Sequence, residues 1–411
     1  MHSLRNVAAL IGSITILQLA QGVLGVRLPL AFAADGYSTA ALGLVAAAYS
    51  AGFMLGAVGA TTLLARVGHI RVYAASAAIL SVTILALHGA GDVWSWGFAR
   101  LIGGVAAALM FAAVESWLSY SVVAKERGEV MGIYMVATKA AIAFGPFLAV
   151  TYAADAAEPW MIAGAVTALS LVPVCFTTAA QPDPPKAQPL ALVEQFATAP
   201  AAVIACFGAG LINTGVLTLA PLFAAERYGA AAATEFYAAA WAGSLLLQWP
   251  AGRVSDRFDR RLVIAVLAGG AALCALILAL LGARIPAWAG VLVFFVWGAG
   301  ALSYYGIAVA HMADRADRGR LAQSTSGLLF VWASGSVIGP LIASPLVDWV
   351  GVSGVFWFAG AGGAVLAAAM FWRRAASLAT EEGQKEEFAP HPATSIAAVE
   401  IAYGEDKPER L

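Results

Sequence analysis

Four ionisable side chains interrupt long apolar runs in the first half of this sequence, and they are its strongest candidates for chemistry. They are Arg27, Arg100, Glu115 and Lys139. Each run is long enough to cross a lipid bilayer, where an ionisable group is costly and usually has a function. A guanidinium or an ammonium in such a place favours an anionic or polar solute. A carboxylate withdrawn from water is suited to carrying a proton.

The four groups lie at different depths if their runs are helices. At about 1.5 Å of rise per residue, Glu115 lies about 22 Å along the helix from Arg100, too far for a direct ion pair. Lys139 lies near the middle of its run, where it cannot reach the membrane surface, so we expect it to serve a function. For the other three a structural role stays open. Arg27 can extend to the outer surface, Arg100 can bind backbone carbonyls, and Glu115 can pair with a basic residue of the next loop.

The second half of the chain offers polar and aromatic groups in its apolar runs instead of charges. We expect Asn213, Trp241 and Tyr304 to line a binding site, together with Gln21 from the first run. Further groups of this kind are Gln248, Trp297, Tyr305 and Gln323.

The composition is that of a membrane protein. Hydrophobic residues make up 61% of the 411 residues and charged residues 11%, whereas a soluble globular domain is about half apolar and about a quarter charged. The net charge of −1 provides no basic surface for nucleic acid. The three cysteines lie inside apolar runs, which argues against a disulfide framework or a metal cluster. We expect no metal and no cofactor.

Twelve apolar segments predict twelve membrane-spanning helices. They cover residues 7–33, 40–64, 72–90, 94–121, 129–153, 159–179, 199–224, 234–254, 262–282, 286–311, 322–347 and 352–372. The first segment ends in a sequence that resembles a signal-peptide cleavage site, but it is too long for a signal peptide, and we interpret it as the first helix.

The two halves of the chain repeat each other. Arg66 and Arg257 are 191 residues apart, and so are Gly52 and Gly243. Duplicated multi-spanning chains are typical of transporters with a site between the halves. We therefore expect an all-α membrane protein built from two six-helix pseudo-repeats.

The expected boundaries follow from changes in composition. Residues 1–179 form an N-terminal half, 180–198 a cytoplasmic linker, 199–372 a C-terminal half and 373–411 a tail. The linker contains the helix-breaking run Gln-Pro-Asp-Pro-Pro-Lys. The tail is polar and rich in glutamate at its start, so we expect it to be disordered.

The basic residues are confined to alternate loops. One set of loops and ends holds Arg5, Arg66, Arg71, Lys125, Arg127, Lys186, Arg253, Arg257, Arg260, Arg261, Arg315, Arg318, Arg320, Arg373 and Arg374. The opposite set holds Asp35, Asp92, Asp155, Glu158 and Asp348, with only two basic residues, Arg227 and Arg284. The positive-inside rule then predicts that both termini and the linker are cytoplasmic. We expect a multi-pass protein of a bacterial-type inner (cell) membrane.

The stretch 248–261 carries the most specific motif. Gly252, Asp256 and Arg257 fit the G-x-x-x-D-R-x-G-R-R loop of the major facilitator superfamily, and Asp259 stands where that loop has its second glycine. The equivalent stretch of the first half keeps Arg66 and Gly68 but has Ala65 in place of the acid.

Other elements also resemble that superfamily. The run from Arg100 to Gly104 is similar to its R-x-x-x-G element, and Gly145-Pro146 and Gly339-Pro340 are similar to its helix-bending G-P pairs. Within the family, the Val-Glu-Ser-Trp run at 114–117 and the Gln-Trp-Pro run at 248–250 resemble the YcaD-type permeases. The resemblance covers about residues 7–372. It implies a twelve-helix transporter that works by alternating access, with the loop and bend residues taking part in the conformational change.

Asp256 is expected to act as a latch between the halves. The positive end of a helix dipole attracts a carboxylate, and the start of the predicted helix 129–153, near Arg127 and Gly128, is the expected target. The alternative is an ion pair with Arg253 or Arg260 in its own loop.

The function that these features favour is secondary active transport of a small anionic or polar solute, with Glu115 as a candidate proton carrier. No ATP-binding G-x-x-x-x-G-K-[ST] run is present, and no hydrolase motif points to an enzyme. A drug/proton antiporter and a non-transporting receptor or scaffold stay open as alternatives. The expected partners are a small-molecule substrate, protons and the lipid bilayer, with no nucleic acid, and we expect a monomer.

Overall fold

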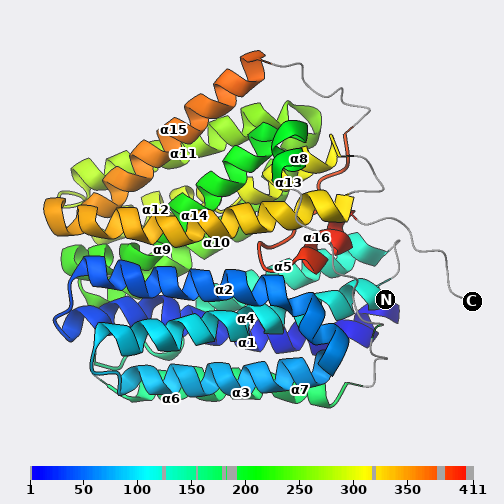
Figure 1. Ribbon diagram of the computed structural model, residues 1–411. Coiled ribbons are helices and arrows are strands. Elements are labelled where there is room, and N and C mark those ends of the chain that lie inside the picture. Colours follow the sequence, from blue (N-terminus) through cyan, green and yellow to red (C-terminus); the bar gives the residue numbers. More distant parts are fainter. Residues whose placement is uncertain are drawn as a thin grey trace, which may run out of the picture.

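A computed structural model describes residues 2–122, 126–153, 156–177, 182, 192–316, 321–376 and 385–403. Within these residues the chain is helical, and the long helices run along one common direction (Figure 1). The start of α1 and the end of α15 lie at the same end of the bundle, which we call the terminal end (Figure 1). We call the opposite end the distal end. The charged loop residues Lys125, Asp155, Lys186, Arg318 and Arg320 lie outside the described residues.

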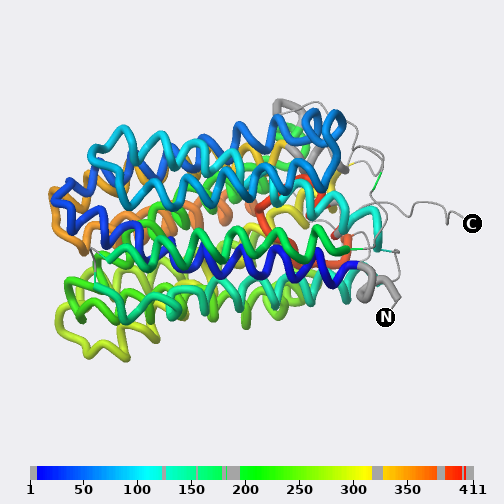
Figure 2. The backbone as a smooth tube through the Cα atoms, turned by 90° about the horizontal axis from the view of Figure 1, so that it is seen from below, coloured from blue at the N-terminus to red at the C-terminus, as the bar shows by residue number. Residues whose placement is uncertain are grey.

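Each half contains six long helical segments. The first half comprises α1 (His2–Ala34), α2 (Thr39–Val67), α3 (His69–His88), α4 (Val93–Ser121), α5 (Arg127–Phe144) with the 3-10 turn η2 (Gly145–Leu148), and α6 (Glu158–Leu169) with α7 (Leu171–Cys175). The second half comprises α9 (Pro200–Tyr228), α10 (Ala230–Arg257), α11 (Arg260–Leu281), α12 (Ala287–Ala301) with α13 (Tyr304–Ala313), α14 (Leu321–Val350) and α15 (Gly354–Ala376). Figure 2 shows the same bundle from below.

Eleven segments of the described chain are long and apolar enough to cross a membrane. The remaining long helix, α10, has a similar length but carries Glu235, Arg253, Asp256 and Arg257. Each of the predicted spans has a helical counterpart, and the all-α fold is confirmed. The four most exposed tryptophans of the described chain lie near the ends of the spans, as is typical of a membrane interface; they are Trp94, Trp288, Trp349 and Trp372.

The repeat seen in the sequence is also a repeat of helix contacts. A Cβ atom on Gly52 of α2 would lie 2.0 Å from the carbonyl oxygen of Leu101 on α4. Its counterpart Gly243 of α10 makes the same approach to Phe295 of α12, at 2.1 Å. The second helix of each pair carries a matching glycine. Gly104 of α4 faces the Tyr49 carbonyl oxygen of α2, and Gly298 of α12 faces the Ala240 carbonyl oxygen of α10. Small residues at these sites let the helix backbones touch.

The two G-P pairs also lie at close helix contacts. Gly145 faces the Leu19 carbonyl of α1, and Gly339 faces the Leu211 carbonyl of α9, with Cβ distances of 2.2 and 2.0 Å. Pro146 lies in η2, and Pro340 lies inside α14. Equivalent helices of the two halves therefore pack in the same way at these bends.

At the distal end the two halves touch directly. The backbone N–H groups of Thr39 and Ala40, at the start of α2, donate to the Asp348 carboxylate of α14 over 3.1 and 2.9 Å. An aspartate from the second half thus caps a helix of the first. Close by, Gly43 lets α2 approach the carbonyl oxygen of Pro340.

The prediction of a disordered tail is wrong for residues 385–403. They form an extended stretch followed by α16 (Ile396–Tyr403), and α16 packs against α4, α5 and α14. Burial of an apolar run explains the order, because Ala398 and Val399 are almost inaccessible to solvent. The predicted linker also differs: its last part is a short helix, α8 (Leu192–Thr198), while residues 183–191 lie outside the described chain.

The close helix contacts predict opposite effects for two glycines of α2. Gly52→Ala should lower stability by about 1–3 kcal/mol, because the added methyl group collides with the α4 backbone. Gly59→Ala should leave stability unchanged or raise it by up to about 1 kcal/mol, since nothing lies within 4 Å of its Cβ position. Thermal unfolding of the purified variants measures both. Equal melting temperatures for the two variants would contradict the close-contact account.

Candidate functional site

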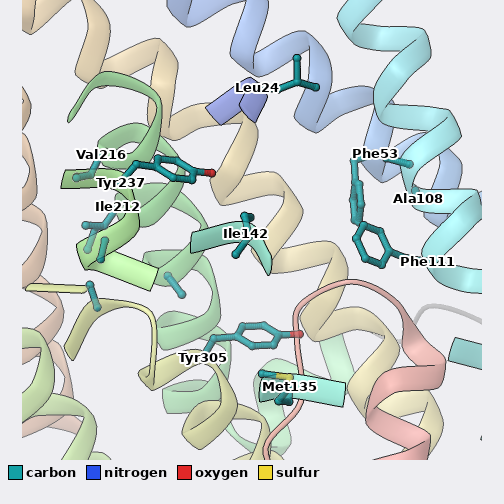
Figure 3. Close-up of a cluster of buried hydrophobic side chains, with 14 of the residues drawn as sticks. Leu24, Phe53, Ala108, Phe111, Met135, Ile142, Ile212, Val216, Tyr237 and Tyr305 are labelled. Carbon is teal, nitrogen blue, oxygen red and sulfur yellow. The ribbon is translucent and has the colours of Figure 1, made fainter. Parts of the chain in front are cut away.

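A cavity of about 360 Å³ lies between the halves. Its walls come from α1, α2, α4, α5, α9, α10, α13 and α14, and residues 391–394 form part of its lining. This volume lies within the range of about 300–1,000 Å³ that is typical of small-molecule sites. Most of the lining is apolar, and Figure 3 shows part of it, including Leu24, Phe53, Phe111 and Ile142.

Arg100 is one of two cations among the described residues of the cavity wall. Its guanidinium carbon lies 3.8 Å from the centre of the Tyr49 ring, which is a cation–π contact. The Tyr49 hydroxyl accepts a hydrogen bond from Gln21 over 3.3 Å, so the predicted residue Gln21 supports this pair. The contact depends on the close packing of α2 and α4, since Gly104 lies one turn from Arg100 and faces the Tyr49 backbone.

Lys139 is the second cation, and it joins the two halves. It is 8% exposed, and its Nζ donates to Ser244 Oγ and Gln248 Oε1 of α10. An ammonium has three N–H donors, so one stays available for a further acceptor. Two of the four predicted ionisable candidates, Arg100 and Lys139, therefore line one cavity.

Four buried polar atoms of cavity-lining residues lack a hydrogen-bond partner within the described chain. They are Arg100 Nε, Trp241 Nε1, the Tyr305 hydroxyl oxygen and His391 Nε2. A buried donor without an acceptor costs about 1–3 kcal/mol, so the donors of Arg100, Trp241 and Tyr305 favour an acceptor in the cavity.

The predicted aromatic and amide residues are only partly in the wall. Asn213 and Trp241 line the cavity, and Asn213 donates to the Ala301 carbonyl over 2.8 Å. The Tyr304 side chain is directed at Asn213 Oδ1, 3.4 Å away, and does not line the cavity. The neighbouring Tyr305, in the first turn of α13 after the break that follows α12, lines it instead.

Arg27 lies outside the cavity. It is 6% exposed and donates to the Ala156 carbonyl over 3.0 Å, in the connection between η2 and α6. This contact to a backbone carbonyl at the distal end is the structural role considered for Arg100, whereas the structural role considered for Arg27 was extension to the outer surface.

Glu115 is fully buried at the terminal end of the cavity. Its carboxylate accepts hydrogen bonds from three hydroxyl groups, those of Tyr134 on α5 and of Thr394 and Ser395 in the C-terminal segment. Within the described chain these hydroxyls are the partners of the Glu115 carboxylate; of the basic loop residues considered as alternative partners, Lys125 lies outside the described residues.

Asp256 does not contact the start of α5 in this structure. Its carboxylate accepts the Phe388 N–H over 3.1 Å and pairs with Arg260 Nη1, also at 3.1 Å. The alternative pairing within its own loop is thus observed, together with a contact to the tail. Gly252, one turn earlier, has the Phe388 ring against it: an added Cβ would lie 1.9 Å from that ring.

The other predicted switch residues lie at helix ends. Arg66 and Arg257 are exposed in the last turns of α2 and α10. Gly68 has a φ of 89°, a backbone conformation that favours glycine, and joins α2 to α3 in a single residue. Asp259, which departs from the family motif, caps α11 by accepting the Arg261 N–H over 3.0 Å.

Sequence reasoning missed a buried ion pair at the terminal end. Arg260 and Asp314 are both 1% exposed, and Arg260 Nε lies 2.7 Å from Asp314 Oδ2. Burial raises the pKa of the Asp314 carboxyl, and the Arg260 contacts offset only part of that rise. Both residues lie outside the apolar runs of the sequence. The returning tail contacts both: the Glu386 carbonyl accepts from Arg260, and the Glu386 N–H donates to Asp314 over 3.0 Å.

A metal centre is not indicated in the described part of the chain, where no three histidine, cysteine or acidic side chains converge.

The sequence is similar to the proteins of one family. The Major Facilitator Superfamily matches over residues 10–326 and 237–403. The MFS-type transporter YcaD of Salmonella dublin is 27% identical over 349 residues, covering 84% of this chain and 89% of YcaD, and the protein of Salmonella gallinarum is equally similar.

Two solved structures have a similar fold. The nucleoside transporter NupG has a TM-score of 0.71 at 14% identity and covers 90% of this chain and 100% of its own. A bacterial homologue of the human lysosomal transporter Spinster, inward-facing and occupied, also has a TM-score of 0.71, at 15% identity, and covers 92% and 97%.

Proposed function

The chain belongs to the major facilitator superfamily, and we propose that it moves a small anionic or polar organic solute across the membrane by alternating access. The observation that carries this proposal is the cavity between the halves, with Arg100 and Lys139 in an otherwise mainly apolar wall. Buried charges in a membrane bundle usually mark the path of a substrate or ion.

The charges of the wall favour an anion. No aspartate or glutamate is among the described lining residues, whereas Arg100 and Lys139 both are. Two like charges in a cavity with low polarity attract an anion more strongly than they would in water. The unpartnered Arg100 Nε and the free N–H of Lys139 would meet its acceptor oxygens, and the apolar wall would cover its carbon skeleton.

The contacts at the two ends favour alternating access. The halves touch at the distal end through Asp348 and the start of α2, while at the terminal end the C-terminal segment lies between them. If the basic loops are cytoplasmic, as the positive-inside rule predicts, this conformation is closed to the outside.

Cationic drug export is the second candidate. The aromatic wall formed by Tyr49, Tyr237, Trp241 and Tyr305 favours it, because aromatic faces attract cations. The positive charges of Arg100 and Lys139 oppose it.

A ligand screen on the purified protein decides between the two solute classes. We expect an organic anion from a panel that includes benzoate and gluconate to raise the melting temperature, and tetraphenylphosphonium to have no effect. A ligand at 100 times its Kd adds about 2.7 kcal/mol to stability. Lys139→Gln should lose the effect of the anion, while Arg284→Gln, an exposed distal residue, should retain it. Stabilisation by the cation alone, or an equal anion effect in Lys139→Gln, would contradict the proposal.

Proton coupling through Glu115 has its own test. In proteoliposomes, a pH gradient should accelerate uptake of the anion found in the screen, and Glu115→Gln should abolish that acceleration because an amide cannot release a proton. Uptake without a gradient should persist in the variant. If Glu115→Gln responded to the gradient as the unmodified protein does, Glu115 would have no role in coupling.

A further inference from the structure

The C-terminal segment, residues 385–403, lies where the cavity would otherwise open at the terminal end. We propose that this segment is an autoinhibitory plug: while docked it closes the cavity, and solute can exchange at the terminal end only after it leaves. The proposal concerns access to the cavity, and it rests on the proposed function only for its effect on transport.

The first anchor of the plug is on the second half of the bundle. Phe388 is 6% exposed, its ring covers Gly252, and its N–H donates to the Asp256 carboxylate. Lys385 Nζ donates to the carbonyl oxygens of Asp256 and Phe258 over 3.2 and 2.7 Å, where the last carbonyls of α10 need donors. Two residues of the family's most specific loop motif, Gly252 and Asp256, therefore bind the chain's own tail.

The middle of the plug forms part of the cavity lining. His391, Pro392, Ala393 and Thr394 all line the cavity. The His391 ring is 1% exposed and lies edge-on between Tyr305 and Tyr403, with ring centres 5.9 and 5.7 Å apart. Burial lowers the pKa of His391 to about 4, so the ring is neutral near pH 7 and leaves the charge of the cavity unchanged. In Figure 3 the loop of the tail passes beside Tyr305.

The second anchor is on the first half of the bundle. Thr394 and Ser395 donate their hydroxyl hydrogens to the two carboxylate oxygens of Glu115. Ser395 also caps α16 by accepting the Ala398 N–H over 3.4 Å. The segment therefore binds both halves, through Asp256 on α10 and Glu115 on α4.

The contacts that hold the segment can dissociate without unfolding the helix bundle. An isolated helix as short as α16 (8 residues) is unstable in water, so its order depends on docking. The contacts with Glu115 and Asp256 are hydrogen bonds to carboxylates, which water can replace. In this conformation the distal end is closed by α2 and α14, so departure of the segment first opens the terminal end, and the halves are then free to alternate.

Cysteine labelling tests the plug without a known substrate. A cysteine replaces Ala333, a cavity-lining residue that is 3% exposed, in a chain whose native cysteines are changed to alanine. The probe is the membrane-impermeant reagent sulfonatoethyl methanethiosulfonate. Ending the chain at Ala376 should raise the labelling rate about tenfold or more, as expected if the segment is docked at least about 90% of the time.

Point variants of the full-length chain test the same contacts in case the truncated chain does not fold. A full-length chain with Phe388→Ala, Thr394→Ala and Ser395→Ala should label faster, while Glu387→Gln, an exposed neighbour, should label as the parent chain does. Adding a synthetic peptide of residues 385–403 to the truncated chain should restore protection, and the same peptide with Phe388→Ala should not. Equal labelling rates in the full-length and truncated chains, with both folded, would overturn the proposal.

Transport supplies an independent readout. If an anion is transported, the truncated chain should carry it faster than the full-length chain. Faster labelling without transport of any anion would support the plug and count against the proposed solute. Transport at an unchanged rate, with unchanged labelling, would support the transporter and reject the plug.

Discussion

An ionisable side chain inside a membrane bundle must be matched by partners or by a ligand, and this constraint organises the structure. Three such groups lie along the interface of the halves, and each is matched differently. Lys139 is held by two oxygen atoms of the other half, Arg100 by an aromatic face, and Glu115 by hydroxyl groups. Only the first two face the cavity, so its charge is positive, and the acid lies at its terminal end under the tail.

The same constraint links the two ends of the molecule. At the distal end Asp348 is matched by the free N–H groups of α2, and at the terminal end Asp256 and Glu115 are matched by the tail. Each carboxylate thus connects one half to the other or to a segment between them. A change of conformation must break the hydrogen bonds of these carboxylates and replace them with others. The carboxylates therefore lie at the two ends where the cavity can open.

Much of the fold was predictable because it depends on local sequence. The spans follow from apolar length, and the repeat follows from glycines such as Gly52 and Gly243, which recur where helix backbones touch. Arg100 and Lys139 were identified because a charge in an apolar run is conspicuous. Tyr305 lines the cavity and Tyr304 does not, a difference that the sequence does not show because the two neighbours follow a break between α12 and α13 that no periodicity signals. The tail was missed because its acidic start dominated its composition and hid the apolar run of α16.

Pulsed EPR distances across both ends test the central claim, that the halves alternate about the cavity and that the tail holds one state. One label pair replaces Glu129 and Arg257 at the terminal end, and the other replaces Asp35 and Val350 at the distal end. The full-length chain should give one main distance for each pair. In the chain ending at Ala376, a second population should appear in both pairs, in equal proportion, with the terminal distance shorter and the distal distance longer. A distal distance that stays single while the terminal distance changes, or no change in either pair, would contradict the account.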